Sequence, residues 1–147
     1  MKKYKNSKKE RALQVIDILK KLYPVATTAL KAGNPFQLLV SVILSAQCTD
    51  ERVNLVTKEL FKKYKTPEDF SGVDNRELEQ LIKSTGFFRN KARNIINMSK
   101  KILKDFKGRV PDTMKDLLKL DGVARKTANI VLYHGSVSYT HLTLPTN

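Results

Sequence analysis

Cysteine is nearly absent from this sequence, which holds one, Cys48, among 147 residues. A single cysteine forms no internal disulfide and no cysteine-ligated cluster, so a reduced, cytosolic setting fits. Long apolar runs are missing as well, because the longest, residues 38–44, is far too short to cross a bilayer. These absences exclude a disulfide-stapled secreted domain and a protein built from membrane spans.

Acidic residues are scarce too. Only 14 Asp and Glu stand against 28 Lys and Arg, and the net charge is +14. Such an excess favours a polyanionic partner, nucleic acid or an anionic membrane surface, over a merely soluble basic protein. The cations concentrate in residues 1–21 and 83–109, whereas the acids gather in residues 50–80. We therefore expect one face of the molecule to be basic.

Helical periodicity runs through almost the whole sequence, and no convincing alternation of period two precedes residue 136. The segment after Asn34 is apolar nearly all round. Asn34 is a suitable helix cap and Pro35 suits the first helical position, so this helix should form the buried centre. The predicted fold class is all-α, one domain with short connections. Further helices are expected in residues 49–64, 66–70, 74–83, 90–106, 111–120 and 124–132.

The basic N-terminal segment predicts one more helix, which Pro24 ends. Leu13, Ile16 and Leu19 share one face of this helix. Packing against a core explains such a stripe, and a helix that lies on a membrane surface is the alternative.

The last twelve residues, 136–147, differ abruptly from the rest. They contain no Asp, Glu, Lys or Arg, are rich in Ser and Thr, and lose the helical period. We interpret them as non-native sequence, similar to translated vector, that contributes nothing to the fold. A native β-rich ending is the alternative.

A glycine turn followed by two cations stands out in residues 120–132. Gly122 permits a positive φ, and the small Ala124 lets another backbone approach closely. Arg125 and Lys126 then occupy the first turn of a helix, where the macrodipole is already positive. A phosphate held by the free N–H groups would remove this conflict. The alternative is an ordinary helical corner with two solvated cations.

This segment, LDGVARKTANIVL, resembles the helix-hairpin-helix of the endonuclease III family of DNA glycosylases, whose pattern is close to L-P-G-V-[GA]-x-K-T-A-N. Residues 38–54, LLVSVILSAQCTDERVN, are similar to the family's buried helix and its A-Q-x-T-D turn. Residues 85–95, TGFFRNKARNI, are similar to its G-[LF]-[YF]-x-x-K-A-x-x-I segment. The resemblance covers about residues 8–135 and rests on three motifs in the same order.

The resemblance implies a chemistry. Family members flip a damaged base, usually an oxidised pyrimidine, out of duplex DNA. A lysine at the position of Lys126 attacks C1′ of the sugar, releases the base and forms a Schiff base, and β-elimination then nicks the strand. Gln47 matches the residue that fills the hole left by the flipped base, and Phe87 matches an apolar wedge. For both, a plain structural role is the alternative. The hairpin residues expected to bind DNA are Gly122, Ala124, Arg125 and Thr127.

The sequence departs from the family in three respects. Asp121 replaces the usual proline of the hairpin. The family's catalytic aspartate follows the hairpin, yet residues 127–147 contain no acid. The four cysteines that bind the family's 4Fe-4S cluster are also absent, so no cofactor and no metal are expected in this chain. The resemblance therefore implies a C-terminally truncated member, with a helix of an incomplete second domain in residues 1–27 and the helix-hairpin-helix domain in residues 28–135.

The sequence is compatible with three functions. The first is a DNA glycosylase with AP lyase activity, in which Lys126 acts on double-stranded DNA carrying a damaged base or an abasic site. The second is a non-catalytic helix-hairpin-helix module that binds duplex DNA, and the third is a basic RNA-binding helical protein. Adenine-mismatch glycosylases carry a glutamate at the place of Val42, which argues against their chemistry. We expect a monomer, without a membrane partner, in the cytoplasm and at the nucleoid if the source is prokaryotic.

Overall fold

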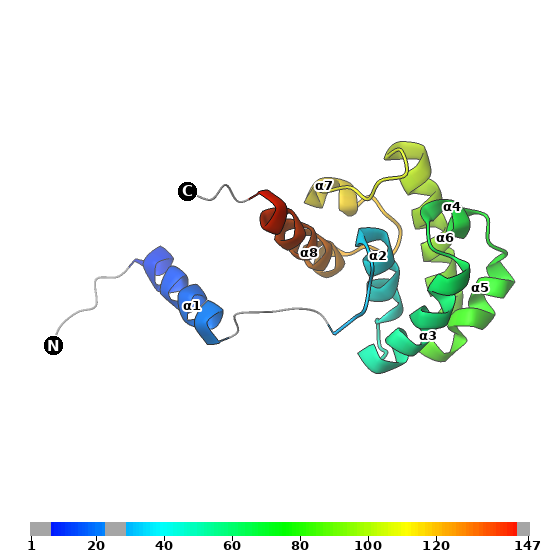
Figure 1. The fold of residues 1–147 in the computed structure, drawn as a ribbon, viewed down its shortest axis with the longest axis horizontal. Coiled ribbons are helices and arrows are strands. Elements are labelled where there is room, and N and C mark those ends of the chain that lie inside the picture. The colour runs from blue at the N-terminus through cyan, green and yellow to red at the C-terminus, as the bar shows by residue number, and fades with distance from the viewer. Residues whose placement is uncertain (1–6, 23–28, 144–147) are drawn as a thin grey trace.

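A computed structural model describes residues 7–22 and 29–143, with side chains up to residue 134 of the last helix. Every regular element in these ranges is helical, which confirms the all-α class (Figure 1). The helices are α1 (Lys8–Leu22), α2 (Pro35–Leu44), α3 (Asp50–Lys63), α4 (Pro67–Ser71), α5 (Asn75–Ile82), the 3-10 turn η1 (Lys83–Thr85), α6 (Phe88–Asp105), α7 (Met114–Leu117) and α8 (Arg125–Thr143).

Most helices begin at a side chain that caps them. The Asn34 side chain accepts a hydrogen bond from the Gln37 backbone N–H at 2.9 Å, and Pro35 follows at the first helical position. Thr66 and Asp69 form a reciprocal capping box at the start of α4. Such caps satisfy backbone donors that a helix start leaves without partners. Further side-chain caps are Ser7 for α1, Thr49 for α3, Asp74 for α5 and Thr113 for α7.

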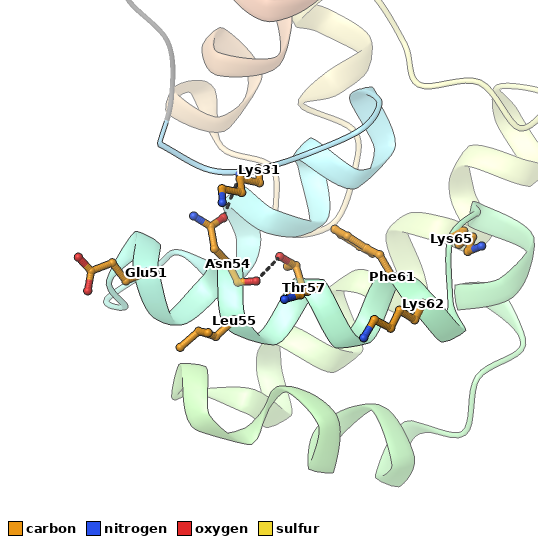
Figure 2. Close-up of a pocket in the computed structure, with 9 residues that line it drawn as sticks. Lys31, Glu51, Asn54, Leu55, Thr57, Phe61, Lys62 and Lys65 are labelled. Carbon is orange, nitrogen blue, oxygen red and sulfur yellow. Dashed lines mark hydrogen bonds between the residues drawn. The ribbon is translucent and has the colours of Figure 1, made fainter.

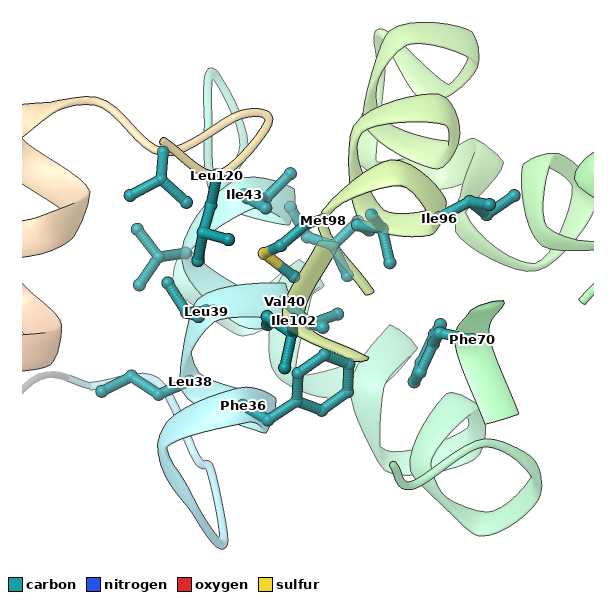
Figure 3. Packing of buried hydrophobic residues seen from close by; sticks show 14 of the residues in the cluster. Phe36, Leu38, Leu39, Val40, Ile43, Phe70, Ile96, Met98, Ile102 and Leu120 are labelled. Carbon is teal, nitrogen blue, oxygen red and sulfur yellow. The ribbon is translucent and has the colours of Figure 1, made fainter. Parts of the chain in front are cut away.

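Helix α2 lies at the centre of the domain, as its apolar sequence predicts. Leu39, Val40 and Leu44 are completely buried, and α2 packs against α3, α6 and α8. In Figure 3 the side chains of α2 meet those of α6, among them Met98 and Ile102. Burial of a leucine-sized side chain stabilises the fold by about 1.5–3 kcal/mol, so this shared core holds the helices in place.

Helices α4 and α5 cover the other side of α6. Phe70 of α4 is completely buried, and its ring centroid lies 5.6 Å from Phe36 and 5.7 Å from Tyr64. Tilted aromatic pairs at this separation add about 0.5–1.5 kcal/mol beyond the area that they bury. The short helix α4 is therefore anchored by one aromatic side chain.

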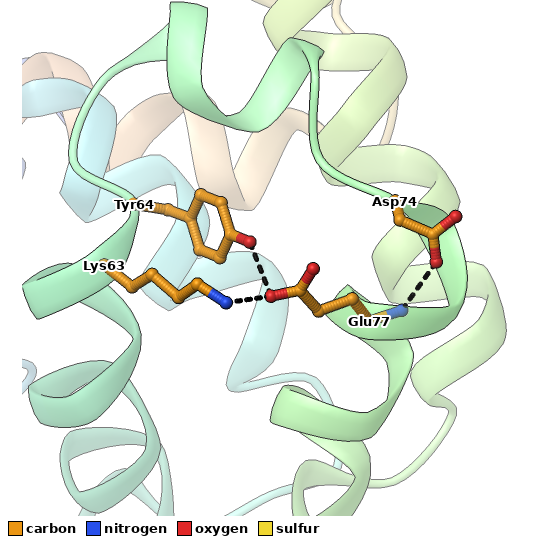
Figure 4. A network of polar contacts seen from close by, with 4 residues as sticks. All are labelled: Lys63, Tyr64, Asp74 and Glu77. Atoms are coloured by element: carbon orange, nitrogen blue, oxygen red, sulfur yellow. Dashed lines mark hydrogen bonds and ion pairs between the residues drawn. The ribbon is translucent and has the colours of Figure 1, made fainter.

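A polar cluster joins the end of α3 to the start of α5 (Figure 4). The Tyr64 hydroxyl donates to Glu77 Oε1 at 2.7 Å, Lys63 forms an ion pair with the same oxygen, and the Glu77 backbone N–H donates to Asp74 at 3.0 Å. The hydrogen bond from Lys63 is the main cause that lowers the pKa of Glu77. The cluster is partly exposed, and it fixes α5 without burying a charge.

Helix α1 forms where the sequence predicts it, but it buries none of its residues. Leu13, Ile16 and Leu19 all remain about half exposed, so the apolar stripe does not pack into the described core. The assignment of residues 1–27 to an incomplete second domain stays a prediction, and residues 1–6 and 23–27 lie outside the described ranges. No helix in the described ranges has the length and hydropathy that crossing a bilayer requires.

The expected loss of helical structure after residue 135 is wrong. Helix α8 continues through Ser136 to Thr143. Helix propagation adds one hydrogen bond for each residue fixed, and no proline interrupts the chain before Pro145, so the helix runs on despite its weak apolar pattern. That residues 136–147 are non-native remains a prediction, and residues 144–147 lie outside the described ranges.

Candidate nucleic-acid interface

The turn between α7 and α8 is fixed by one glycine. Gly122 has φ 77°, and a Cβ atom at this position would lie 3.0 Å from Cβ of Asn94 on α6. Both the left-handed backbone and the close approach of α6 therefore require glycine here. Leu120 and Val123 on either side of the glycine are buried, and the Val123 N–H donates to the Leu120 carbonyl at 3.2 Å. The hairpin is a rigid corner held against α6.

Helix α8 begins without a side-chain cap. The Ala124 carbonyl accepts the first helical hydrogen bond, from the Ala128 N–H at 2.9 Å, but alanine has no side-chain acceptor. Within the described residues, the backbone N–H groups of Arg125, Lys126 and Thr127 have no hydrogen-bond acceptor. This helix start therefore offers free donors and a positive dipole end to an anion.

The side chains at this corner are available to solvent. Arg125 and Lys126 are exposed, and Thr127 is half-buried. No carboxylate in the described part of the chain forms an ion pair with either cation, although the half-buried Asp121 lies in the same turn. The structure thus brings Gly122, Ala124, Arg125, Lys126 and Thr127 together at one corner, as the sequence predicts.

The two predicted DNA-inserting residues both stand in turns with left-handed backbone. Gln47 has φ 51° and is exposed in the turn after α2. Phe87 has φ 45° directly before α6, and 63% of its surface is exposed. Of the adjacent phenylalanines, Phe88 is the one that packs against the core. A large aromatic side chain left in solvent next to one that is partly buried against the core fits a wedge better than a core residue.

The start of α6 repeats features of the α8 corner. Phe87 supplies no side-chain hydrogen bond to cap the helix, and the first turn carries Arg89 but no acid. A hollow of about 380 Å³ lies beside it, lined by Phe87, Phe88, Arg89 and Asn90. The two uncapped α-helix starts among the described residues of the domain, those of α6 and α8, thus both lie in segments that the sequence motifs assign to DNA.

One residue of the motif segments behaves differently from the sequence prediction. Lys91 belongs to the basic stretch 83–109, which we expected on an exposed face, but only 4% of its surface is exposed. Burial lowers the pKa of Lys91. The spacing did contain a signal, because Lys91 falls in line with Ile95, Met98 and Ile102 on the apolar face of α6.

A larger open groove, of about 840 Å³, lies along α3 (Figure 2). Lys31, Asn54 and Phe61 line it, and the Asn54 side chain accepts from the Lys31 backbone N–H at 2.9 Å. None of the predicted site residues lines this groove.

The residues of this sequence do not fit an iron–sulfur cluster. The cluster of the endonuclease III family needs four thiolates, whereas Cys48 is the one cysteine and is half-buried. In the described ranges, no three His, Cys, Asp or Glu side chains gather where they could hold a metal ion.

Comparison with known proteins identifies the class. A family model of HhH-GPD superfamily base excision DNA repair proteins matches residues 40–138. The chain belongs to this superfamily.

The particular relatives are endonucleases III. That of Synechocystis sp. is 58% identical over 128 residues, which cover 87% of this chain and 58% of the relative. That of Bacillus subtilis is 53% identical over 117 residues, or 80% of this chain and 53% of the relative. The chain thus spans a little over half of these curated relatives. The resemblance stated from the three motifs is confirmed.

Solved structures agree with the fold. A trapped covalent intermediate of endonuclease III with DNA superposes with a TM-score of 0.76 at 47% identity, covering 86% of this chain and 60% of that chain. A thermostable thymine-DNA glycosylase superposes with a TM-score of 0.71 at 27% identity, covering 84% and 58%. The all-α helix-hairpin-helix fold is therefore confirmed.

Proposed function

We propose that this chain is the helix-hairpin-helix portion of a base-excision-repair DNA glycosylase with AP lyase activity, acting on oxidised pyrimidines in duplex DNA. The observation that carries the proposal is Lys126, an exposed lysine in the first turn of an uncapped helix. A hairpin that served only to bind phosphate would not need a lysine at this place. The superfamily and the endonuclease III relatives give the reaction class.

The reaction begins with the base out of the stack. The backbone N–H groups at the start of α8 hold a phosphate of the damaged strand, with Arg125 as an additional cation. Phe87 enters between base steps and Gln47 occupies the space of the flipped nucleotide. Unstacking costs a few kcal/mol, and less at a damaged base, which favours damaged sites.

Lys126 then acts as the nucleophile. Its neutral Nζ forms a bond to C1′ while the glycosidic C1′–N bond breaks, and the departing base takes up a proton. Loss of the amine proton and opening of the sugar ring give a Schiff base between Nζ and C1′. Removal of a C2′ proton expels the 3′ phosphate by β-elimination, which nicks the strand, and water finally releases the lysine.

A second candidate function is a non-catalytic module that binds duplex DNA. It is favoured by the lack of any Asp or Glu after Lys126 in this sequence, since the family reaction uses an aspartate there to stabilise the sugar cation. Both functions place the chain on DNA, and we propose a cytoplasmic monomer, at the nucleoid if the source is prokaryotic.

Borohydride trapping separates the two functions. Wild-type chain is incubated with a duplex that contains one abasic site, and sodium borohydride reduces any Schiff base to a stable adduct that is counted on a denaturing gel. We expect an adduct that Lys126→Ala abolishes. One missing exposed cation should change duplex affinity by only about 1 kcal/mol or less, so binding persists.

Lys58→Ala is the matched control, because it removes an exposed lysine from α3. It should trap as well as wild type. Equal adducts with wild type and Lys126→Ala would show that another amine reacts. Tight duplex binding with no adduct from wild type would support the binding module instead.

A further inference from the structure

Lys91 is buried among apolar side chains, where an ammonium group is costly unless every donor has a partner. It lies one helical turn before Ile95, whose side chain is completely buried, and only 4% of its own surface is exposed. Its ammonium group therefore does not contribute to the basic surface formed by residues 83–109. Its position requires another explanation.

Three carbonyl oxygens surround the Lys91 ammonium. Nζ donates to the carbonyls of Leu44 at 2.8 Å, Ala46 at 2.9 Å and Thr85 at 2.8 Å. Lysine has three N–H donors, so each donor has one acceptor. Leu44 is the last residue of α2, where unpaired carbonyls carry partial negative charge, Ala46 lies in the turn that follows, and Thr85 ends η1.

Two of these carbonyls lie close in the sequence to a DNA-inserting residue. Ala46 directly precedes Gln47, and Thr85 precedes Phe87 by two residues, through Gly86. Gln47 and Phe87 both hold left-handed backbone, which a non-glycine residue keeps only when its surroundings enforce it. In the described residues, the Lys91 ammonium makes the only hydrogen bonds that connect the two turns.

We propose that Lys91 is a positioning residue, which ties the Gln47 turn to the Phe87 turn so that the two side chains enter the duplex together at a fixed separation. This inference rests on the proposed function of the chain. Two side chains that replace a nucleotide and unstack a neighbouring base step must keep their spacing, and an error of 1 Å in placement can cost about 100-fold in rate. Lys91 acts through the two turns and does not contact DNA.

The hairpin is tied to the same helix. Asn94, about one turn after Lys91, packs so closely against Gly122 that a Cβ atom added to the glycine would lie 3.0 Å from the Cβ atom of Asn94. Lys101, further along α6, donates to the carbonyl of Lys119 in the hairpin at 2.9 Å. Side chains of α6 thus contact the turn that contains Gln47, the turn that contains Phe87 and the hairpin that contains Lys126. Lys91 makes the contacts to the first two.

The first test measures the turns in the absence of DNA. Nitroxide labels are attached to the variants Gln47→Cys and Phe87→Cys, combined in a Cys48→Ser background, and electron paramagnetic resonance gives the distribution of distances between them. We expect a broader distribution when Lys91→Met is added, because methionine fills the space but donates no hydrogen bond. An unchanged distribution overturns the proposal, whatever activity the chain has.

The second test measures recognition. Affinity of the unlabelled chain is compared for a duplex with a stable abasic-site analogue and for the intact duplex. Lys91→Met should reduce the preference for the abasic duplex by tenfold or more and leave affinity for the intact duplex within twofold. If wild type itself shows no preference, the proposed function fails, while the distance measurement still decides the role of Lys91.

Two further variants exclude a merely structural effect. Ile102→Ala removes a completely buried side chain three turns further along α6 and should keep the wild-type preference and distances. An equal loss of preference in Ile102→Ala overturns the proposal. Lys91→Gln keeps two N–H donors and should give an intermediate loss of preference. If circular dichroism shows that Lys91→Met is unfolded, the result for Lys91→Gln is used in its place to test the proposal.

Discussion

Two lysines of the motif segments, Lys91 and Lys126, differ in almost every physical respect. Lys91 sits inside the domain, and each of its N–H donors has a carbonyl acceptor; two of those carbonyls belong to the last residue of α2 and to the turn after it, far away in the sequence. Lys126 stands exposed in the first turn of α8, without an ion-pair partner among the described residues. All three N–H donors of the Lys91 amine are used in hydrogen bonds within the fold, whereas the Lys126 amine faces solvent.

Under the proposed function, the same type of side chain orders the fold at Lys91 and performs chemistry at Lys126. A nucleophile needs a lone pair and access to its substrate, and Lys126 has the access. A structural ammonium needs a complete set of acceptors, because an unpaired buried donor is destabilising, and Lys91 has that set. The rigidity around Lys126 comes instead from a glycine turn that keeps the amine open to solvent.

Chemical accessibility should give the largest contrast. Under reductive methylation, we expect Lys126 to react about as fast as the exposed Lys58, and Lys91 to react at least about 100-fold more slowly. Lys91 must wait for local unfolding of the core, and each 1.4 kcal/mol of opening free energy slows the reaction tenfold. Peptide mass spectrometry over time measures the three rates. Rates within a few-fold of one another would contradict the burial of Lys91.

The next largest difference is expected in the free energy of unfolding lost when each lysine is replaced. Lys91→Met removes the donor from three carbonyls, those of Leu44 and Thr85 buried and that of Ala46 partly exposed, and should lower the free energy of unfolding by about 3 kcal/mol. Lys126→Met changes an exposed side chain and should stay within about 0.5 kcal/mol of wild type. Urea denaturation followed by circular dichroism measures both. A Lys91→Met variant as stable as wild type would mean that the carbonyls find other donors.

The glycine turn that holds Lys126 in place can be tested in the same way. Gly122→Ala must adopt a positive φ and press against Asn94, so we expect a loss of about 1–2 kcal/mol. Gly72→Ala is the matched control, because Gly72 has φ −103° and a Cβ there would meet its nearest atom at 3.9 Å. This control should be neutral or slightly stabilising. Equal effects of the two substitutions would remove the special role of the turn.

Salt dependence distinguishes a cation that contacts phosphate from one that does not. Affinity for intact duplex is measured between about 50 and 200 mM salt, a range over which counterion release is readily detected. Arg125→Ala, which removes the cation proposed to lie at the phosphate, should reduce the log–log slope by about 0.9. Lys91→Met should leave the slope unchanged. A flat response in wild type would contradict DNA binding altogether.

The smallest effect is expected from the far end of α8. Deletion of residues 136–147 shortens the helix beyond Lys126 but removes no Asp, Glu, Lys or Arg side chain. We expect the free energy of unfolding to change by less than about 1 kcal/mol. Thermal melts of the shortened and complete chains give the comparison. A larger loss would show that the segment packs against the domain and is native.

Local chemistry let the sequence determine much of this protein. A cap acts within one helical turn, so Asn34, Thr66 and Asp74 marked helix starts that the structure confirms. Gly122 and Lys126 lie within one short motif, and their arrangement depends on neighbouring residues. The continuation of α8 past residue 135 was missed because its apolar pattern is weak, while helix propagation needs only unbroken hydrogen bonding.

The role of Lys91 was decided by the tertiary structure alone. Its place on the apolar face of α6 was visible in the spacing, but its acceptors at the end of α2 lie 47 and 45 residues away in the sequence. A side chain of the same type and charge is a solvated cation where nothing covers it and a structural ammonium where three carbonyls meet. Which of the two it becomes depends on how α2, η1 and α6 pack, because burial and hydrogen-bond partners are properties of the folded chain.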